Sequence, residues 1–201
     1  MKQLIKGNKL NMDICMLQEC IERNYGKEYY GTFDECVAEM RRRAMSAMEI
    51  EDEDEFAQAI EDEDVLFEVD TEDMRAYARG EKYGQNHDWV IRHITPVDAE
   101  TAVDPGDYIK EHALKANIWL PWETDEQNIQ EPFFAETFAA ALDEMTRRAM
   151  DKLDFSECEL GSISEDGDTC FMVDEDDQSG YAWGEDYGNN IDLMILRLTQ
   201  D

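Results

Sequence analysis

The strongest constraint on this fold is that the sequence repeats itself at an offset of 104 or 105 residues. The segment TFDECVAEMRRRAM, which begins at Thr32, recurs as TFAAALDEMTRRAM 105 residues later. LFEVDTED from Leu66 recurs as CFMVDEDD, and YARGEKYGQNHDW from Tyr77 recurs as YAWGEDYGNNIDL, both at an offset of 104. Matches that keep one order at nearly one offset predict a tandem duplication.

The repeat also sets the expected domain boundaries. We expect a first unit at residues 1–95 and a second at residues 111–201. The stretch 96–110 contains an Asp-Pro-Gly turn signal and shows no long apolar periodicity. Such a composition is typical of a linker between two folded units.

Each unit is expected to contain one helix and several strands. Thr32 and Glu35 have the spacing of a capping box, and apolar residues follow at helical spacing from Phe33 to Met48. The second copy keeps this pattern from Thr137 but lacks the glutamate of the box. VLFEV, TCFMV, HDWVIRHI and IDLMILRL have the β-branched and aromatic content of strands. This order predicts an α+β fold in which one helix packs on a small antiparallel sheet in each unit.

The glycines of the repeated YARGEKYG segment are expected at a turn. Gly80 and Gly84 both persist in the second copy, whereas Arg79, Lys82 and His87 are replaced. A pair of active sites should retain its reactive side chains, so the comparison favours a scaffold over a catalytic loop. We therefore expect both glycines to serve a strand-to-strand connection.

The net charge is the unusual feature of the composition. Fifty acidic residues face eighteen basic ones, which gives a formal charge of −32. Each half of the chain carries 25 of the acids, so the charge is not confined to a tail. Such a surface repels nucleic acids and anionic lipids and attracts basic proteins. The chain has no signal-peptide pattern and no apolar run of membrane-spanning length, and we expect a cytoplasmic protein.

Few residues suggest catalysis or metal binding. The five cysteines form no Cys-x-x-Cys pair and are expected to be reduced. The three histidines belong to no hydrolase or metalloprotease motif. DEDDQSGYAWGE approximates a calcium loop, but its glycine is seventh instead of sixth. We expect no enzymatic activity, no cofactor and no metal site, although a pair of catalytic carboxylates among fifty acids stays open.

Two arginines recur in a chain that has few bases. Arg42 and Arg43 match Arg147 and Arg148. One interpretation is a contact with an anion or an acidic partner. The preferred interpretation is structural, because Glu39 and Glu144 lie four residues before Arg43 and Arg148 in the favourable orientation for helical ion pairs.

Acidic runs recur along both units. Each run by itself fits a solvated loop, but clustered like charges oppose folding. The more specific hypothesis is therefore that the negative electrostatic field of these runs has a function. The candidate partner-binding residues are Glu51, Asp52, Glu53, Asp54, Glu55, Glu61, Asp62, Glu63, Asp64, Asp70, Glu72, Asp73, Glu165, Asp166, Asp168, Asp174, Glu175, Asp176 and Asp177.

In charge and size the chain resembles the acidic DNA-mimic inhibitors of phages and mobile elements, such as anti-CRISPR and anti-restriction proteins. The resemblance implies a non-enzymatic inhibitor whose carboxylates replace phosphates in the basic groove of a nuclease. A CRISPR effector is the first candidate target and a restriction enzyme the second. An immunity-type or adaptor protein for another basic partner is the alternative. A general halophilic adaptation or binding of divalent ions would also produce an acidic surface.

Overall fold

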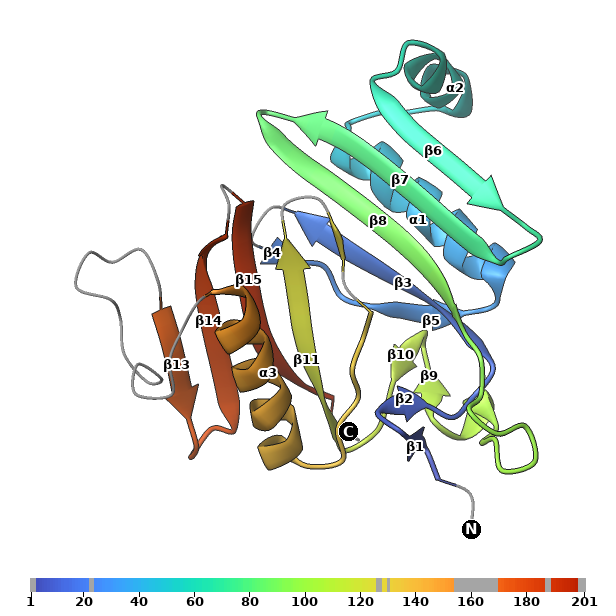
Figure 1. Cartoon of the computed structure of the whole chain (residues 1–201). Coiled ribbons are helices and arrows are strands. Elements are labelled where there is room, and N and C mark those ends of the chain that lie inside the picture. The colour runs from blue at the N-terminus through green and yellow to red at the C-terminus, as the bar shows by residue number, and fades with distance from the viewer. Residues whose placement is uncertain are drawn as a thin grey trace. The chain divides into compact units, whose positions relative to one another are not determined.

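Two compact bodies form the protein, and each contains a sheet and a helix. The computed structural model describes residues 3–21, 24–125, 128–129, 131–153, 170–186 and 189–198. The first body comprises Met12–Leu114, and the second comprises Met1–Asn11 together with Lys115–Asp201. The described residues contain three α-helices and antiparallel sheets (Figure 1). The α+β class expected from the sequence is confirmed.

The first body is built on a six-stranded antiparallel sheet. Its elements are β3 (Ile14–Ile21), β4 (Asn24–Tyr25), β5 (Tyr29–Gly31), α1 (Phe33–Ala47), α2 (Glu53–Glu61), β6 (Val65–Asp70), β7 (Arg75–Lys82) and β8 (Gln85–Ile94). The strands lie in the order β4-β3-β8-β7-β6, and β5 also pairs with β3. Strand β6 is therefore at one edge. A 3₁₀ turn (Pro105–Asp107) and the hairpin of β9 (Ile109–Lys110) and β10 (Ala113–Leu114) complete the body.

The second body has the same order of main elements. They are β11 (Ile118–Asp125), β12 (Asn128–Ile129), α3 (Phe138–Lys152), β13 (Cys170–Asp174), β14 (Ser179–Asp186) and β15 (Asn189–Leu198). The strand order is β12-β11-β15-β14-β13, so β13 occupies the edge position that β6 has in the first body. The hairpin of β1 (Ile5–Lys6) and β2 (Lys9–Leu10) belongs to this body.

Helix α1 begins where the sequence predicts. The Thr32 hydroxyl accepts a hydrogen bond from the Glu35 amide, and the Glu35 carboxylate accepts one from the Thr32 amide at 2.8 Å. These bonds satisfy two amides that the first turn leaves without helical partners. At α3, Thr137 accepts from the Ala140 amide at 3.2 Å, and the reciprocal bond is missing because position 140 is alanine.

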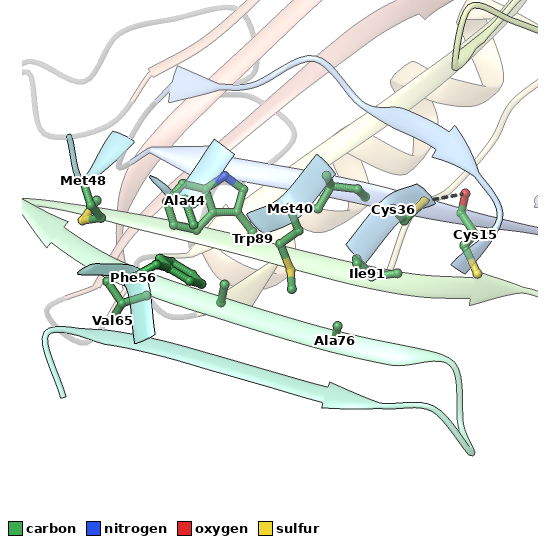
Figure 2. Packing of buried hydrophobic residues seen from close by; sticks show 12 residues of the cluster. Cys15, Cys36, Met40, Ala44, Met48, Phe56, Val65, Ala76, Trp89 and Ile91 are labelled. Atoms are coloured by element: carbon green, nitrogen blue, oxygen red, sulfur yellow. Dashed lines mark hydrogen bonds between the residues drawn. The ribbon is translucent and has the colours of Figure 1, made fainter. Parts of the chain in front are cut away.

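The core of the first body lies between α1 and one face of the sheet. Cys36, Met40 and Ala44 recur along the buried side of α1 and contact Trp89 and Ile91 of β8 (Figure 2). All five side chains are buried. The helical spacing that predicts the helix therefore also identifies the residues that hold it on the sheet. In the second body, Ala141, Met145 and Ala149 of α3 form the corresponding cluster.

Gly80 and Gly84 of the repeated YARGEKYG segment have different structural roles. Gly84 has a φ of +77° in the turn between β7 and β8, as predicted for a strand connection. The prediction for Gly80 is wrong, because Gly80 lies inside β7. A Cβ at Gly80 would come within 2.6 Å of the Met48 sulfur. The absence of a side chain at Gly80 thus allows Met48 to pack against the sheet.

Candidate functional site

The largest concentration of acid in the first body is one continuous stretch, which we call the acidic segment (Glu49–Asp73). It contains fourteen aspartates and glutamates and no lysine or arginine. All fourteen are exposed. The segment runs from the end of α1 through α2 and β6 into the turn before β7. Twelve of the candidate residues therefore share one surface element of a single body.

Part of this segment is a helix, although the sequence suggested solvated loops. Asp52 begins α2 by accepting a hydrogen bond from the Glu55 amide at 2.8 Å. Glu53, Asp54 and Glu55 occupy the first turn, where negative charge interacts favourably with the helix dipole. The carboxylates of α2 are consequently held on a regular element instead of a flexible loop.

One aromatic pair and one arginine attach α2 to the sheet. Phe56 of α2 is fully buried and meets Phe67 of β6 edge to face, with 5.5 Å between ring centroids. The Arg41 guanidinium lies 5.2 Å from the Phe56 ring and 5.1 Å from the Phe67 ring. Arg41 also pairs with Glu53 at 2.6 Å. At the position equivalent to Arg41 the second copy has Thr146, so the arginine of this attachment is not repeated in the second copy.

The turn between β6 and β7 presents another group of acids. Asp70 accepts hydrogen bonds from the amides of Glu72 and Asp73 at 2.9 and 3.1 Å. This geometry turns the chain and leaves the carboxylates of Glu72 and Asp73 exposed. Asp70 is therefore partly a turn residue, whereas Glu72 and Asp73 are available to a partner.

The second body repeats this turn between β13 and β14. Asp174 accepts from the amides of Asp176 and Asp177, both at 3.0 Å. Asp174, Glu175, Asp176 and Asp177 are all exposed. The remaining candidates, Glu165, Asp166 and Asp168, lie outside the described residues.

The recurrent arginines are structural, as the preferred interpretation predicts. Arg43 donates to Glu39 at 2.8 Å and Arg148 donates to Glu144 at 2.7 Å. Hydrogen bonds from Arg42, followed by those from Arg43, lower the pKa of Glu39 to about 2. Each of the four arginines is thus engaged in an ion pair within its own helix.

Arg43 and Arg148 each contact a second carboxylate, which the sequence did not lead us to expect. Arg43 also donates to Glu19 of β3 at 2.8 Å, and Arg148 donates to Glu123 of β11 at 3.0 Å. Lys152 pairs with Glu123 as well. Glu19 and Glu123 occupy matching positions in the two copies, and this match was the signal that could have revealed them. The pairs join each helix to a central strand.

A tyrosine–aspartate pair also recurs. Tyr77 donates to Asp88 at 2.5 Å, and Tyr181 donates to Asp192 at 2.9 Å. Burial, followed by the hydrogen bond to Asp88, raises the pKa of Tyr77. Because both aspartates are buried and each bond crosses two neighbouring strands, we assign these pairs to the stability of the sheets.

The described cysteines have the environment of core residues. Cys15, Cys36 and Cys170 are free thiols, and they are buried, as is Cys20. Burial raises the pKa of Cys15 to about 11 and that of Cys36 to about 12, so neither thiol forms an appreciable thiolate at neutral pH. Across the described ranges, no three His, Cys, Asp or Glu side chains are grouped so that they could hold a metal ion.

Comparison with known proteins gives no relative. No family model, curated protein or solved structure matches the chain. Within the described part of the chain, no helix has the length and apolar character needed to span a membrane.

Proposed function

We propose that this protein is a non-enzymatic inhibitor whose acidic segment occupies the basic nucleic-acid groove of a nuclease. The observation that carries the proposal is the Glu49–Asp73 segment, with fourteen exposed carboxylates and no base. A CRISPR effector nuclease is the first candidate target and a restriction enzyme the second. The inhibitor would compete with DNA for the groove.

The spacing of the carboxylates supports the proposal within a single body. The six residues of β6 span about 20 Å. The contact between Phe56 and Phe67 places α2 beside β6 instead of beyond its end. Duplex DNA of about 20 Å carries roughly 12 phosphates. The fourteen carboxylates of the acidic segment are therefore slightly more numerous than the phosphates that DNA presents over this length.

The attachment of α2 supports the proposal further. Side-chain and loop ordering on binding costs about 0.5–1.5 kcal/mol per immobilised long side chain. Phe56 and Arg41 already hold α2 against β6, so its backbone loses little freedom when a partner binds. Lysine and arginine side chains of the target can then form charge-assisted hydrogen bonds with carboxylates of fixed position.

Charge neutralisation on α2 and its flanks tests the proposal. The test variant carries Glu51→Gln, Asp54→Asn, Glu61→Gln and Glu63→Gln. The matched control carries Glu100→Gln, Glu111→Gln, Glu136→Gln and Asp143→Asn, which are exposed acids outside the segment. Both variants change the net charge equally, so a difference between them reports position and not total charge.

Inhibition of DNA cleavage is measured with purified CRISPR effector nucleases and restriction endonucleases. Exposed ion pairs contribute about 0.2–1 kcal/mol each, so losing four should weaken inhibition at least about fourfold in the test variant only. Inhibition that is equal in both variants would contradict the assignment to the acidic segment. If no nuclease is inhibited but another basic protein binds, the alternative of an immunity-type or adaptor protein is favoured.

We also propose that the two bodies arose by tandem duplication. Their main elements occur in one order, and the matched sequence segments fall on equivalent elements. Superposition of experimental coordinates of the two bodies checks this, because equivalent Cα atoms should pair at offsets of 104 or 105 residues.

A further inference from the structure

Each body contains a short hairpin that directly precedes, along the chain, the first long strand of the other body. The hairpin β1–β2 directly precedes β3 of the first body, yet it belongs to the second body. The hairpin β9–β10 directly precedes β11 of the second body, yet it belongs to the first. Each hairpin therefore completes one body and then leads into the other.

The two hairpins are equivalent in geometry. Gly7 and Asn8 have φ values of +57° and +61°, and Glu111 and His112 have +50° and +61°. Positive φ at both central residues is the pattern of a type I′ turn, which suits a two-residue hairpin. Asn8 and His112 are separated by the same 104 residues that relate the two copies.

The contact that each hairpin makes is also equivalent. The Phe134 amide donates to the Asn8 carbonyl at 3.0 Å, and the Tyr30 amide donates to the His112 carbonyl at 2.8 Å. Tyr30 and Phe134 are again 104 residues apart and both are 1% exposed. The two contacts are therefore equivalent: the hairpin that precedes each body's first long strand contacts the other body. We call this arrangement the exchange of hairpins.

Each hairpin carries a buried leucine, and the second hairpin also carries a stacked ring. Leu10 of the first hairpin is 0% exposed and Leu114 of the second is 4% exposed. The His112 ring stacks on Tyr29 with centroids 4.2 Å apart. Each hairpin therefore combines a backbone hydrogen bond to the body that it joins with a buried apolar side chain.

Charge favours the exchanged arrangement over an uncrossed one. Lys9 of the first hairpin lies 3.9 Å from Glu131. The residue equivalent to Glu131 in the first copy is Lys27. If each hairpin instead packed on the body that directly follows it along the chain, Lys9 would lie close to Lys27. The contribution is small, because both partners of the observed pair are mostly exposed, but its sign favours the observed connectivity.

We propose that each body has a hairpin-docking site whose occupant is the hairpin of the opposite copy, and that this site binds in trans. A chain cut in the segment 96–104 should then remain one particle, because each fragment supplies a hairpin that the other fragment binds. This inference does not depend on the proposed inhibitory function.

The test inserts a protease site between Ala99 and Glu100, which are exposed, and cuts the folded protein. At micromolar concentration the two fragments should coelute on size exclusion at the position of the uncut protein. Leu10→Asp or Leu114→Asp places a charge in a docking site and should weaken association by at least a hundredfold. Val97→Asp is the matched control, since Val97 is 49% exposed. Fragments that separate without any substitution overturn the proposal.

A crosslink identifies the connectivity even if the leucine variants fail to fold. A zero-length carbodiimide should couple Lys9 to Glu131 in the cut protein and join the two fragments covalently, as detected by mass spectrometry. Lys9→Gln should abolish that crosslinked peptide. If the fragments stay bound but Lys9 couples only within its own fragment, the hairpins are not exchanged and the proposal is wrong.

Discussion

Replacing Arg43 by methionine should destabilise the first body more than any single surface change. Arg43, Glu19 and Glu39 have side chains that are 14%, 13% and 15% exposed. Methionine retains the apolar stem but leaves the Glu19 carboxylate without its guanidinium. Glu39 keeps its ion pair with Arg42 at 2.7 Å, so the cost arises mainly at Glu19.

The magnitude follows from the burial of that carboxylate. Removing one partner of a buried ion pair costs about 3–5 kcal/mol, and the remaining exposure of Glu19 places this site at the lower end, near 3 kcal/mol. Arg148→Met is the internal comparison. Glu123 is only 3% exposed but keeps the ion pair with Lys152. We therefore expect a smaller cost of about 2 kcal/mol in the second body.

Urea unfolding at pH 7 measures the loss of unfolding free energy in Arg43→Met and in Arg148→Met. Native-state hydrogen exchange then shows which body each substitution destabilises. In the unsubstituted protein the pKa of Glu39 is lowered to about 2. Its stabilising contribution is complete above its unfolded pKa near 4.5 and is lost only as the pH falls towards 2.

One result would refute this reasoning. An Arg43→Met cost below about 1 kcal/mol would mean that water or another group replaces the guanidinium beside Glu19. The double variant Glu19→Gln/Arg43→Met provides the control, and it should recover part of the loss because no charge is left unpaired.

Three further predictions concern α2, the net charge and the sheet. Arg41→Thr, which installs the residue of the second copy, should speed amide exchange in α2 about tenfold, since a cation–π contact contributes about 0.5–2 kcal/mol; unchanged exchange would show that Phe56 alone holds the helix. Raising NaCl from about 10 mM to about 0.2 M should increase the melting temperature by several degrees by screening repulsion among the acids, and a flat response in differential scanning calorimetry would contradict this. Gly80→Ala should cost about 1 kcal/mol in urea unfolding, because its Cβ meets the sulfur of the flexible Met48 side chain, and adding Met48→Ala should relieve that overlap; a Gly80→Ala variant as stable as the original protein would disprove the packing argument.

The long regular elements were predictable because their signals are local. The capping residues and apolar spacing that predict α1 and α3 lie within one helix, and alternating or continuous apolar runs mark β6, β8, β13 and β15. The i,i+4 pairs of Glu39 with Arg43 and Glu144 with Arg148 are local as well. Each of these features depends on residues fewer than about twenty positions apart, so no knowledge of tertiary contacts was needed.

The sequence by itself determined the charge of this protein, its α+β class and the recurrence of its main elements, because these follow from composition, short-range periodicity and self-comparison. Tertiary structure decided the rest. Helix α2 depends on Phe67 and Arg41, which lie outside its own residues. Arg43 donates a hydrogen bond to Glu19, which is 24 residues away in the sequence. The Phe134 amide donates to the Asn8 carbonyl, which is more than half the chain away. Contacts of that separation leave no local pattern, and folding alone brings their partners together.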